Sequence, residues 1–562
     1  MSEVKKVKKS FFQKFLDSVE KIGNKLPNPL TLFVILSFAI VILSYFLNKM
    51  GISVSYVVTN KTDAGVIETV KKDAAIVSLM NAEGIRYIFS SMVENFKNYP
   101  PLGTTLIAML GVGLAEGAGL VDVVLRKSVA STPKRYITMM LVFLGVMSNV
   151  ASDVGYVVLI PLGGVIFLNL KRHPLAGIAA VFAGVSGGFS ANLLVGTIDP
   201  LLGGISTQAA NILQPGYNVA PTANWYFMIV STVVITLAGT YITEKIIEPR
   251  LGKYKGEKEV SMEEITTDQN RGLKAAGISL LVYLGIMLFL TVPSNAILRN
   301  PETGSLMVRS AFLDGLVPII ALAFFIPGLA YGIVAKTIKN DDDAVKYVTK
   351  AMATMGSLLA LIFVSAQFVA YFSKTNLGIV LAVKGADFLE GMGIKGIPLL
   401  MGFILVSAFI NLFMGSASAK WAIMAPVFVP MFMRLGYSPE LTQLAYRIGD
   451  STTNIITPLM TYFAIIIAFA NSLLPVVNIS LNADVKQICA FAIAKPKALP
   501  NNIAIPSFVD CSINIKYVAQ IIIPIKTTVP KVKNFLTFSS LCSKGLAQDT
   551  FCIFIFDWKK EL

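Results

Sequence analysis

The stretch SASAKWAIMAPVFVPMFMRLGYSPELTQLAYRIGDSTTNIITP, from Ser416 to Pro458, decides the fold of this chain, because an earlier stretch repeats its pattern. The earlier copy runs from Ser152 to Pro200. In each copy two prolines stand 13 positions apart, and the apolar stretch after the second proline ends in Gly, Ser, Thr and Asn residues. Paired interrupted apolar segments, one in each half of a membrane protein, are typical of the binding site of a secondary transporter.

The composition predicts a membrane protein and excludes a soluble enzyme. Hydrophobic residues make up 54% of the 562 residues and charged residues 14%, whereas a soluble protein has about 25% charged residues. A helix needs roughly 20 apolar residues to cross the hydrocarbon core. Apolar stretches predict eight spans, near residues 29–48, 102–120, 136–149, 224–244, 272–292, 312–335, 351–372 and 396–414.

The net charge of +15 is concentrated in a few loops, so it does not indicate nucleic-acid binding. Lys and Arg cluster in segment 1–28, after the second span, in linker 245–271 and after residue 335. The positive-inside rule predicts that these segments are cytoplasmic, as is the N-terminus, and that the mixed-charge loop 51–100 is external. The first apolar stretch has no cleavage site before charged sequence, which predicts a retained span and not a signal peptide.

The last 87 residues, 476–562, differ from the rest of the chain. They are interrupted by Lys and Pro, and they hold all four cysteines, Cys489, Cys511, Cys542 and Cys552. One interpretation is a disulfide-bearing periplasmic domain. We favour a C-terminus replaced through a shifted reading frame. The predicted organisation is therefore a cytoplasmic basic N-terminus (1–28), a transporter domain (29–475) and an atypical tail.

Charged residues inside membrane segments are costly, and they are therefore candidates for function. In the second copy, whose core is 416–458, Ser438 and Pro439 predict a helix start and Gly449 predicts its end. Arg447 and Asp450 stand three apart, on one helix face. One interpretation is a structural ion pair. The other is that Arg447 binds a substrate carboxylate and that Asp450 carries the coupling ion, H⁺ or Na⁺.

Further polar and aromatic residues surround this pair in the second copy. Trp421 offers an aromatic face for a ring or a cation, unless it is a residue of the interfacial belt. Ser451 and Asn454 follow Asp450 where the helix breaks, and they can supply oxygen ligands. These residues indicate a Na⁺ position near Asn454 and Asp450.

The first copy, whose core is 152–200, carries its own set of candidates. Asp199 is either the N-cap of a new helix or a carboxylate that faces Asp450. Asn192 closes the glycine-rich segment 187–192, which resembles a hairpin tip, and backbone carbonyls there could coordinate Na⁺. Asp153 is a further carboxylate inside the membrane part.

The motifs resemble those of the aminobenzoyl-glutamate transporter family (AbgT). The stretches that carry the resemblance are NPLTLFVILS, SNVASDVGYVVLIPLGG, SANLLVGTIDPLLGG and the second copy, so it covers roughly residues 10–470. It implies an all-α polytopic membrane protein with about eight to nine transmembrane helices plus two re-entrant hairpins, built from inverted repeats. It also implies a homodimer similar in fold to carriers of the ion-transporter superfamily. The functional residues that it implies are Asp199, Trp421, Pro439, Arg447 and Asp450.

The resemblance further implies a secondary active transporter of p-aminobenzoyl-glutamate or related aromatic folate-fragment anions, with export of sulfonamides in some members. The expected location is the bacterial inner membrane, and the expected driving force is a Na⁺ or H⁺ gradient. A benzoyl ring with a glutamyl dicarboxylate suits an aromatic platform and a guanidinium. The alternative is a Na⁺-coupled dicarboxylate or citrate carrier of the same superfamily. The membrane part has no nucleotide loop or nucleophile elbow, so we expect neither an enzyme nor a bound cofactor.

Overall fold

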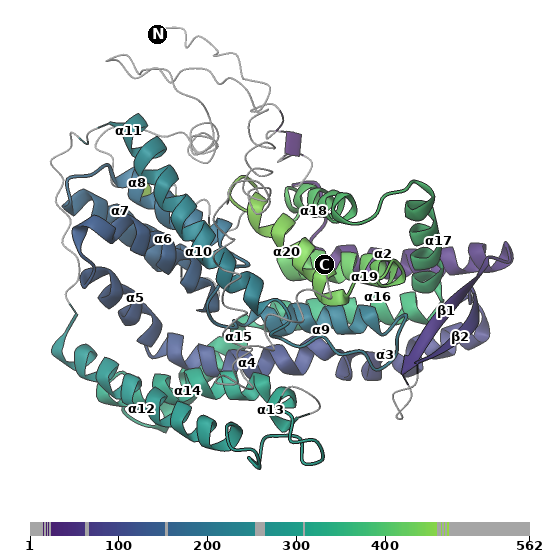
Figure 1. Cartoon of the computed structure of the whole chain (residues 1–562), viewed down its shortest axis with the longest axis horizontal. Coiled ribbons are helices and arrows are strands. Elements are labelled where there is room, and N and C mark those ends of the chain that lie inside the picture. Colours follow the sequence, from purple (N-terminus) through teal and green to yellow (C-terminus); the bar gives the residue numbers. More distant parts are fainter. Residues whose placement is uncertain are drawn as a thin grey trace, which may run out of the picture. The chain divides into compact units, whose positions relative to one another are not determined.

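The computed structural model is mostly helical (Figure 1). It describes residues 24–61, 67–151, 155–252, 254, 265–306 and 310–457, and the single residues Phe15, Ser18, Val19, Lys21, Tyr462, Ile466, Phe469 and Ala470. Asp153 and the tail 476–562 lie outside these described residues, so their interpretation stays a prediction.

Long apolar helices occupy five of the eight predicted spans. They are α2 (Pro29–Lys49), α10 (Trp225–Ile242) with its continuations η5 (Thr243–Ile247) and α11 (Glu248–Leu251), α12 (Thr267–Thr291), α14 (Leu316–Val334) and α16 (Gly356–Lys374). These helices expose large apolar side chains such as Phe38, Leu281 and Phe289. Extensive apolar exposure marks a surface that contacts another apolar phase, and here that phase is lipid. The chain is a multi-pass membrane protein.

A bent pair of helices supplies a sixth candidate span. α3 (Ala82–Lys97) and α4 (Pro100–Gly117) run together, and α5 (Leu120–Ala130) turns away from them by 59°. Gly119 stands at the bend with φ 91°, a left-handed conformation that glycine adopts without steric cost.

The two copies of the sequence pattern form two corresponding sets of short helices. The first set is α6 (Ile137–Met147), η2 (Ser148–Ala151), η3 (Gly155–Leu159), α7 (Ile160–Asn169), α8 (Pro174–Phe182), η4 (Ala183–Gly187) and α9 (Ile198–Ala210). The second set is α18 (Ile397–Asn411), α19 (Ala417–Arg434) and α20 (Pro439–Thr453). The predicted spans 136–149 and 396–414 are α6 and α18, with 11 and 15 residues. These two are shorter than a full crossing, so the described residues hold fewer long spans than expected.

Each set of helices contains one short connection, called its tip, and one interruption of a helix, called its break. The first tip is 148–151, after α6, and the second tip is 412–416, between α18 and α19. The first break is 188–197, between η4 and α9, and the second break is 454–457, after α20. Of segment 187–192, predicted to resemble a hairpin tip, Gly187 ends η4 and residues 188–192 belong to the first break. The two helices beside that break pack on different partners, η4 on α6 and α8, and α9 on α4 and α19.

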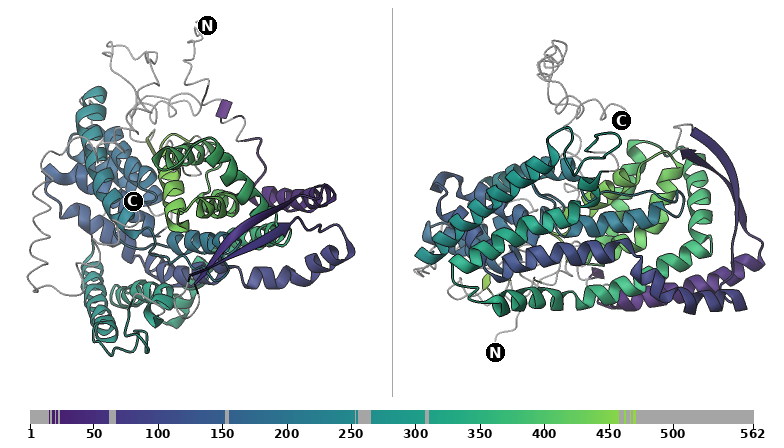
Figure 2. Two further views of the ribbon diagram at one scale, coloured as in Figure 1. Left: turned by 45° about the vertical axis from the view of Figure 1, so that its right-hand side comes forward. Right: turned by 90° about the horizontal axis from the view of Figure 1, so that it is seen from below.

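The two sets of helices meet through α9. This helix of the first set packs against α19 and α20 of the second set, and η4 also contacts α20 (Figure 2). α20 in turn packs along α18. The meeting region belongs to a hydrophobic core that includes Ile205, Phe372, Trp421 and Phe432. Both broken elements are therefore held beside one another.

Three segments differ from the prediction of an all-α fold with irregular loops. Loop 51–100 contains the antiparallel strands β1 (Ser53–Lys61) and β2 (Ile67–Ala75), paired from Ser53 with Ala75 to Lys61 with Ile67, and the helix α3 (Figure 1). The Val-rich, alternating sequence SVSYVV favours a strand, a signal hidden by its charged neighbours. Loop 336–350 is mostly α15 (Asp341–Thr354), which Asn340 caps and three aspartates begin. The unpredicted α17 (Leu377–Gly391) follows α16, and the remaining short elements are η1 (Lys134–Tyr136) and α13 (Ala311–Asp314).

Candidate functional site

The helix that carries most candidate residues begins where the sequence predicts. Ser438 is the N-cap of α20, and its Oγ accepts from the backbone N–H of Leu441 at 3.2 Å. Pro439 follows at the first helical position, where its missing N–H costs nothing. Gly449 does not end the helix, which continues to Thr453. Instead, Gly449 allows α20 to approach α18, because an added Cβ would lie 2.5 Å from the carbonyl oxygen of Ile404.

Arg447 pairs with Asp199 of the other repeat. A terminal guanidinium nitrogen of Arg447 lies in hydrogen-bonded ion-pair contact with Asp199 Oδ1, and both side chains are 1% exposed. Asp199 Oδ2 also accepts from the backbone N–H of Gly196 at 2.6 Å. Asp199 therefore stabilises the start of α9, and the charge that it faces is Arg447 and not Asp450.

Asp450 pairs with Lys420, a residue that the sequence analysis did not single out. Lys420 Nζ lies 2.5 Å from Asp450 Oδ1, and neither side chain is more than 1% exposed. The same ammonium donates to Asn411 Oδ1. The interpretation in which Arg447 and Asp450 form a structural ion pair with each other is wrong, since each residue has its partner on another element.

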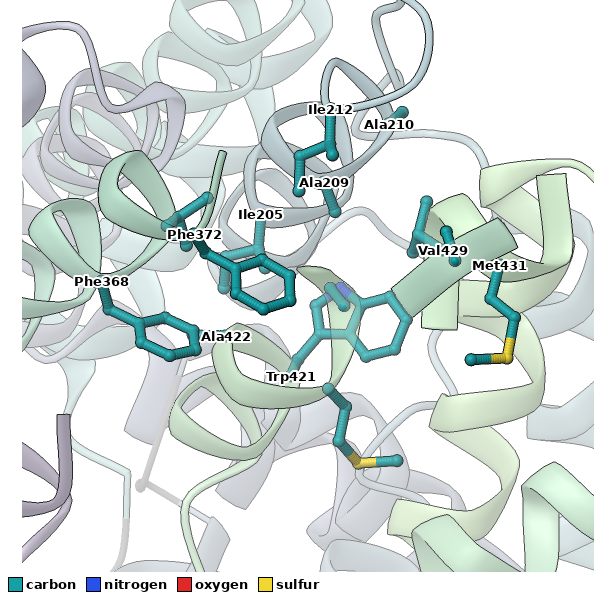
Figure 3. Close-up of a cluster of buried hydrophobic side chains, with 14 of the residues drawn as sticks. Ile205, Ala209, Ala210, Ile212, Phe368, Phe372, Trp421, Ala422, Val429 and Met431 are labelled. Carbon is teal, nitrogen blue, oxygen red and sulfur yellow. The ribbon is translucent and has the colours of Figure 1, made fainter. Parts of the chain in front are cut away.

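Trp421 is buried in the core. Its ring stacks on Tyr446 with a centroid distance of 4.5 Å and an interplanar angle of 25°. Its Nε1 donates to Ser206 Oγ at 2.9 Å, and Figure 3 shows the indole among apolar side chains such as Ile205 and Val429. Because Trp421 is fully buried, its interpretation as an interfacial belt residue is wrong.

The remaining candidates lie at the two breaks. Ser451 Oγ accepts from the backbone N–H of Ser190 at 2.9 Å, so it links α20 to the first break. Asn454 Oδ1 accepts from Asn411 Nδ2 at 2.8 Å, and Asn192 Oδ1 accepts from the backbone N–H of Leu194 at 3.0 Å. Na⁺ was predicted near Asn454 and near Asn192, and the amide oxygens of both residues already accept hydrogen bonds.

The structure brings four of the five principal candidates into the buried region where α9, α19 and α20 meet, and the two ion pairs of this region are called the network here. Asp199, Arg447 and Asp450 belong to the two ion pairs, and Trp421 follows Lys420 on α19. The fifth, Pro439, stands two turns away at the start of α20, where it fixes the entry of the helix. With two carboxylates and two cations, the network is neutral as arranged, which a low-dielectric interior requires.

Sequence reasoning missed two members of this network, Lys420 and Asn411. Lys420 stands inside the quoted apolar stretch, so the rule that a charge within a membrane segment is a candidate applies to it directly. Asn411 ends an apolar helix and donates to the carbonyl oxygen of Asp450 at 2.7 Å and to Thr453 Oγ1 at 2.8 Å. Its role depends on the fold, and the sequence contained no signal for it.

The described residues were also compared with the requirements of a metal site and of a ligand cavity. Among the residues that the structure describes, no three His, Cys, Asp or Glu side chains are grouped to hold a metal ion. A cavity of about 1060 Å³ lies against α5 and α7, where its lining includes Arg126, Lys127 and Pro161. None of the five principal candidates lines it, so it is not the candidate site.

Comparisons with known proteins place this chain among transporters. Residues 14–485 match the model of the AbgT putative transporter family. The p-aminobenzoyl-glutamate transport protein of Escherichia coli (strain K12) is 39% identical over 451 residues, which cover 80% of this chain and 86% of that protein.

Two solved structures are similar to this chain in fold and sequence. MtrF of Neisseria gonorrhoeae, from a class of antimetabolite efflux pumps, is 46% identical with a TM-score of 0.78, over 85% of this chain and 95% of that chain. The YdaH transporter of Alcanivorax borkumensis, which has an unusual topology, is 42% identical with a TM-score of 0.74. That match covers 83% of this chain and 96% of the other.

Proposed function

Since the chain belongs to the AbgT putative transporter family, we propose that it is a secondary active transporter of p-aminobenzoyl-glutamate or a related aromatic folate-fragment anion. The observation that carries this proposal is the pair of fully buried ion pairs where the two repeats meet. The relative from Escherichia coli, a p-aminobenzoyl-glutamate transport protein, supports the choice of substrate.

The Asp199–Arg447 pair supplies the binding step. A guanidinium binds carboxylates through a planar fork of donors, so a glutamyl carboxylate can take the place of Asp199 on Arg447. That exchange keeps Arg447 paired at every stage, which avoids the large cost of a bare buried charge. The substrate then lies between α9 and α20, because these two helices carry the pair.

The Lys420–Asp450 pair supplies the coupling step. Asp450 has one cation beside it already, and a gradient-driven ion can bind only if the pair loosens as access to the site alternates. One charge that moves through 100 mV yields about 2.3 kcal/mol, enough for roughly a 50-fold substrate gradient. Either Na⁺ or H⁺ can supply this free energy.

Export of sulfonamides is a second candidate function. It is favoured by the similarity to MtrF, which belongs to a class of antimetabolite efflux pumps. The competing carrier of dicarboxylates or citrate is not favoured, because the chain matches the AbgT family and its relative from Escherichia coli is a p-aminobenzoyl-glutamate transport protein. We place the protein as a homodimer in the bacterial inner membrane, with a cytoplasmic N-terminus.

Uptake into proteoliposomes tests this proposal. The full chain is reconstituted, Na⁺ and pH gradients are imposed separately, and labelled p-aminobenzoyl-glutamate is added. We expect accumulation above the external concentration with one of the two gradients. If neither gradient drives accumulation of this substrate, the proposed function is wrong, and a labelled sulfonamide is tested in the same vesicles.

A further inference from the structure

Two polar contacts join α9 to α20. The first is the ion pair of Asp199 with Arg447, and the second is a hydrogen bond of 2.6 Å that Ser206 Oγ donates to Gln443 Oε1. Asp199 and Ser206 share one face of α9, because they stand seven positions apart. Gln443 and Arg447 share one face of α20, because they stand four apart. The two contacts therefore belong to one interface between these helices.

The hydrogen bonds around Gln443 fix the orientation of its amide. Asn224 Nδ2 donates to the backbone carbonyl of Glu440 at 3.0 Å, so Asn224 Oδ1 is left to accept from Gln443 Nε2, at 2.8 Å. At the other end, Trp421 Nε1, which can only donate, donates to Ser206 Oγ at 2.9 Å. The hydroxyl of Ser206 then has its one hydrogen available for Gln443. Gln443 therefore presents its oxygen, and not its nitrogen, toward α9.

This oxygen requires a donor. Ser206, Gln443 and Asn224 are all at most 3% exposed, so water does not supply one. A buried acceptor that loses its hydrogen bond is costly. Any group that takes the place of the Ser206 hydroxyl as α9 and α20 separate must itself donate a hydrogen bond to Gln443.

At the first contact, Arg447 has a nitrogen without an acceptor. Arg447 Nε is buried and has no hydrogen-bond partner among the residues that the structure describes. Asp199 meets the guanidinium through Oδ1, while its Oδ2 accepts from the backbone N–H of Gly196. A free carboxylate can bind two guanidinium nitrogens at once. The group that suits this end of the interface is therefore a carboxylate.

The proposed substrate carries a group of each kind. In p-aminobenzoyl-glutamate the glutamyl carboxylates accept hydrogen bonds and the ring amine donates them. Standard bond lengths place the amine roughly 9–10 Å from a carboxylate in the extended molecule. Asp199 and Ser206 are separated by about 10.5 Å along α9, at 1.5 Å per residue. One extended molecule can therefore replace both groups of α9, while α20 supplies the guanidinium and the amide oxygen.

We infer that Gln443 determines specificity for an aromatic amine, because its Oε1 accepts a hydrogen bond from the ring amine of the substrate in the place that the Ser206 hydroxyl has in this structure. Asn224 is a positioning residue, since it holds the amide of Gln443 in the orientation that presents oxygen. The inference rests on the proposed function, for which it names the group recognised at the end of the substrate remote from Arg447. A sulfonamide that carries the same p-aminophenyl ring would meet the same oxygen.

A series of matched ligands tests this inference. Calorimetry on the full chain in detergent, at fixed Na⁺ and pH, compares p-aminobenzoyl-glutamate, p-hydroxybenzoyl-glutamate and benzoyl-glutamate. Benzoyl-glutamate keeps both carboxylates and lacks the donor, so its affinity should be about tenfold lower than that of the amine, because Gln443 Oε1 is left without a partner in the complex. The phenol still donates, and its affinity should lie within about threefold of that of the amine.

Two variants should change the preference for the amine over benzoyl-glutamate in opposite directions. Gln443→Met keeps a side chain of similar length without the acceptor, and it should bind the two ligands equally. Ser206→Ala removes the hydroxyl that competes for Gln443 Oε1, and it should raise the preference about fivefold. A merely structural effect would weaken both ligands together and leave the ratio of their affinities unchanged.

Gln367→Met on α16 is the matched control for the loss of a buried glutamine. Gln367 is 5% exposed and bonds to the carbonyl oxygen of Met92 and to Asn95, so it serves the contact with α3 and not the site. The preference should be retained in this variant. If Gln443→Met does not fold, the ligand series on the wild type and Ser206→Ala still decide the role of Gln443.

The outcomes separate this role from the proposed function. Equal affinities of the wild type for the amine and for benzoyl-glutamate, or a phenol bound as weakly as benzoyl-glutamate, would overturn it. A preference kept in Gln443→Met, lost in Gln367→Met or lowered in Ser206→Ala would do so as well. In each of these cases the ligands still bind, and the proposed carrier remains. If the wild type binds none of the three ligands, the proposed function is refuted together with the inference.

Discussion

At the scale of single residues, the candidate site consists of two buried ion pairs. Arg447 and Asp450 stand three positions apart on α20, but Arg447 pairs with Asp199 and Asp450 pairs with Lys420. A buried ion pair adds little net stability, while removal of one partner leaves an uncompensated charge. The network is thus sensitive to each single change and tolerant of paired ones.

Single and double substitutions in the Lys420–Asp450 pair distinguish its contribution to stability from its proposed role in ion coupling. Lys420→Gln should destabilise the protein by about 3–5 kcal/mol, because Asp450 remains charged and buried. The double variant Lys420→Gln with Asp450→Asn should recover most of that loss and still be unable to accumulate substrate against its gradient. Unfolding midpoints and uptake are measured on both. A double variant as unstable as the single one would show that the charges do not compensate each other.

A substitution of Arg447 tests whether the site distinguishes charged from uncharged substrates. Arg447→Lys keeps the positive charge beside Asp199 but loses the planar fork. Affinity for p-aminobenzoyl-glutamate should fall about tenfold or more, while affinity for an uncharged sulfonamide should change little. Competition binding with both compounds measures the difference. Equal losses would instead indicate that Arg447 acts only as a structural partner of Asp199.

At the scale of elements, the approach of α20 to α18 depends on one glycine. Gly449→Ala would bring a methyl group to 2.5 Å from the carbonyl oxygen of Ile404 and 2.6 Å from Ser407 Cβ. The resulting overpacking should cost about 1–3 kcal/mol and displace Asp450. Gly402→Ala on α18 is the matched control, since nothing lies within 4 Å of its added Cβ.

Unfolding midpoints and uptake are compared between these two alanine variants, to test whether the close packing of α20 on α18 is required. We expect Gly402→Ala to behave as the wild type, or slightly better because alanine favours a helix. A Gly449→Ala variant with unchanged stability and transport would mean that α20 and α18 can separate without consequence, contrary to the packing described.

The turn between α7 and α8 should make stability depend on pH. His173, the N-cap of α8, lies outside the apolar helices, and burial lowers its pKa to about 4, although Glu248 partly opposes this shift. Below the ordinary pKa of 6.5 the unfolded chain binds a proton that the folded chain does not. Stability should therefore be complete above pH 6.5 and fall toward pH 4, by up to about 1.4 kcal/mol per unit.

The variant His173→Asn isolates this contribution. It should lose less stability than the wild type when the pH is lowered from 7.5 to 5, as measured by thermal unfolding in detergent. Equal losses in both proteins would assign the pH dependence to other groups. Because Asn is a good N-cap residue, its side-chain oxygen can accept from the backbone N–H of Leu175 as His173 Nδ1 does.

Sequence patterns predicted the elements better than the contacts between them. Apolar length identified α2, α10, α12, α14 and α16, and Ser438 with Pro439 identified the start of α20. The strands β1 and β2 were missed, because a short charged hairpin has no apolar run. Partner choice at the site was also missed, since Asp199 and Arg447 are 248 positions apart and spacing along a helix says nothing of such contacts.

At the scale of the whole molecule, duplication with divergence explains the site. In each repeat an asparagine donates to a backbone carbonyl of the broken helix, Asn149 to Val185 and Asn411 to Asp450, but only the second repeat carries the charges of Lys420 and Asp450. The first repeat contributes Asp199, which crosses to Arg447. Neither repeat is complete alone, so the charges are balanced only when the two sets of helices meet.

The central claim is that the substrate carboxylate replaces Asp199 on Arg447. Binding of p-aminobenzoyl-glutamate to the wild type and to Asp199→Asn, measured by calorimetry at fixed Na⁺ and pH, tests it directly. The account predicts about tenfold tighter binding by Asp199→Asn, because its competitor for the guanidinium has lost its charge. Unchanged or weaker binding by Asp199→Asn would contradict the exchange of partners on which the proposed transport step depends.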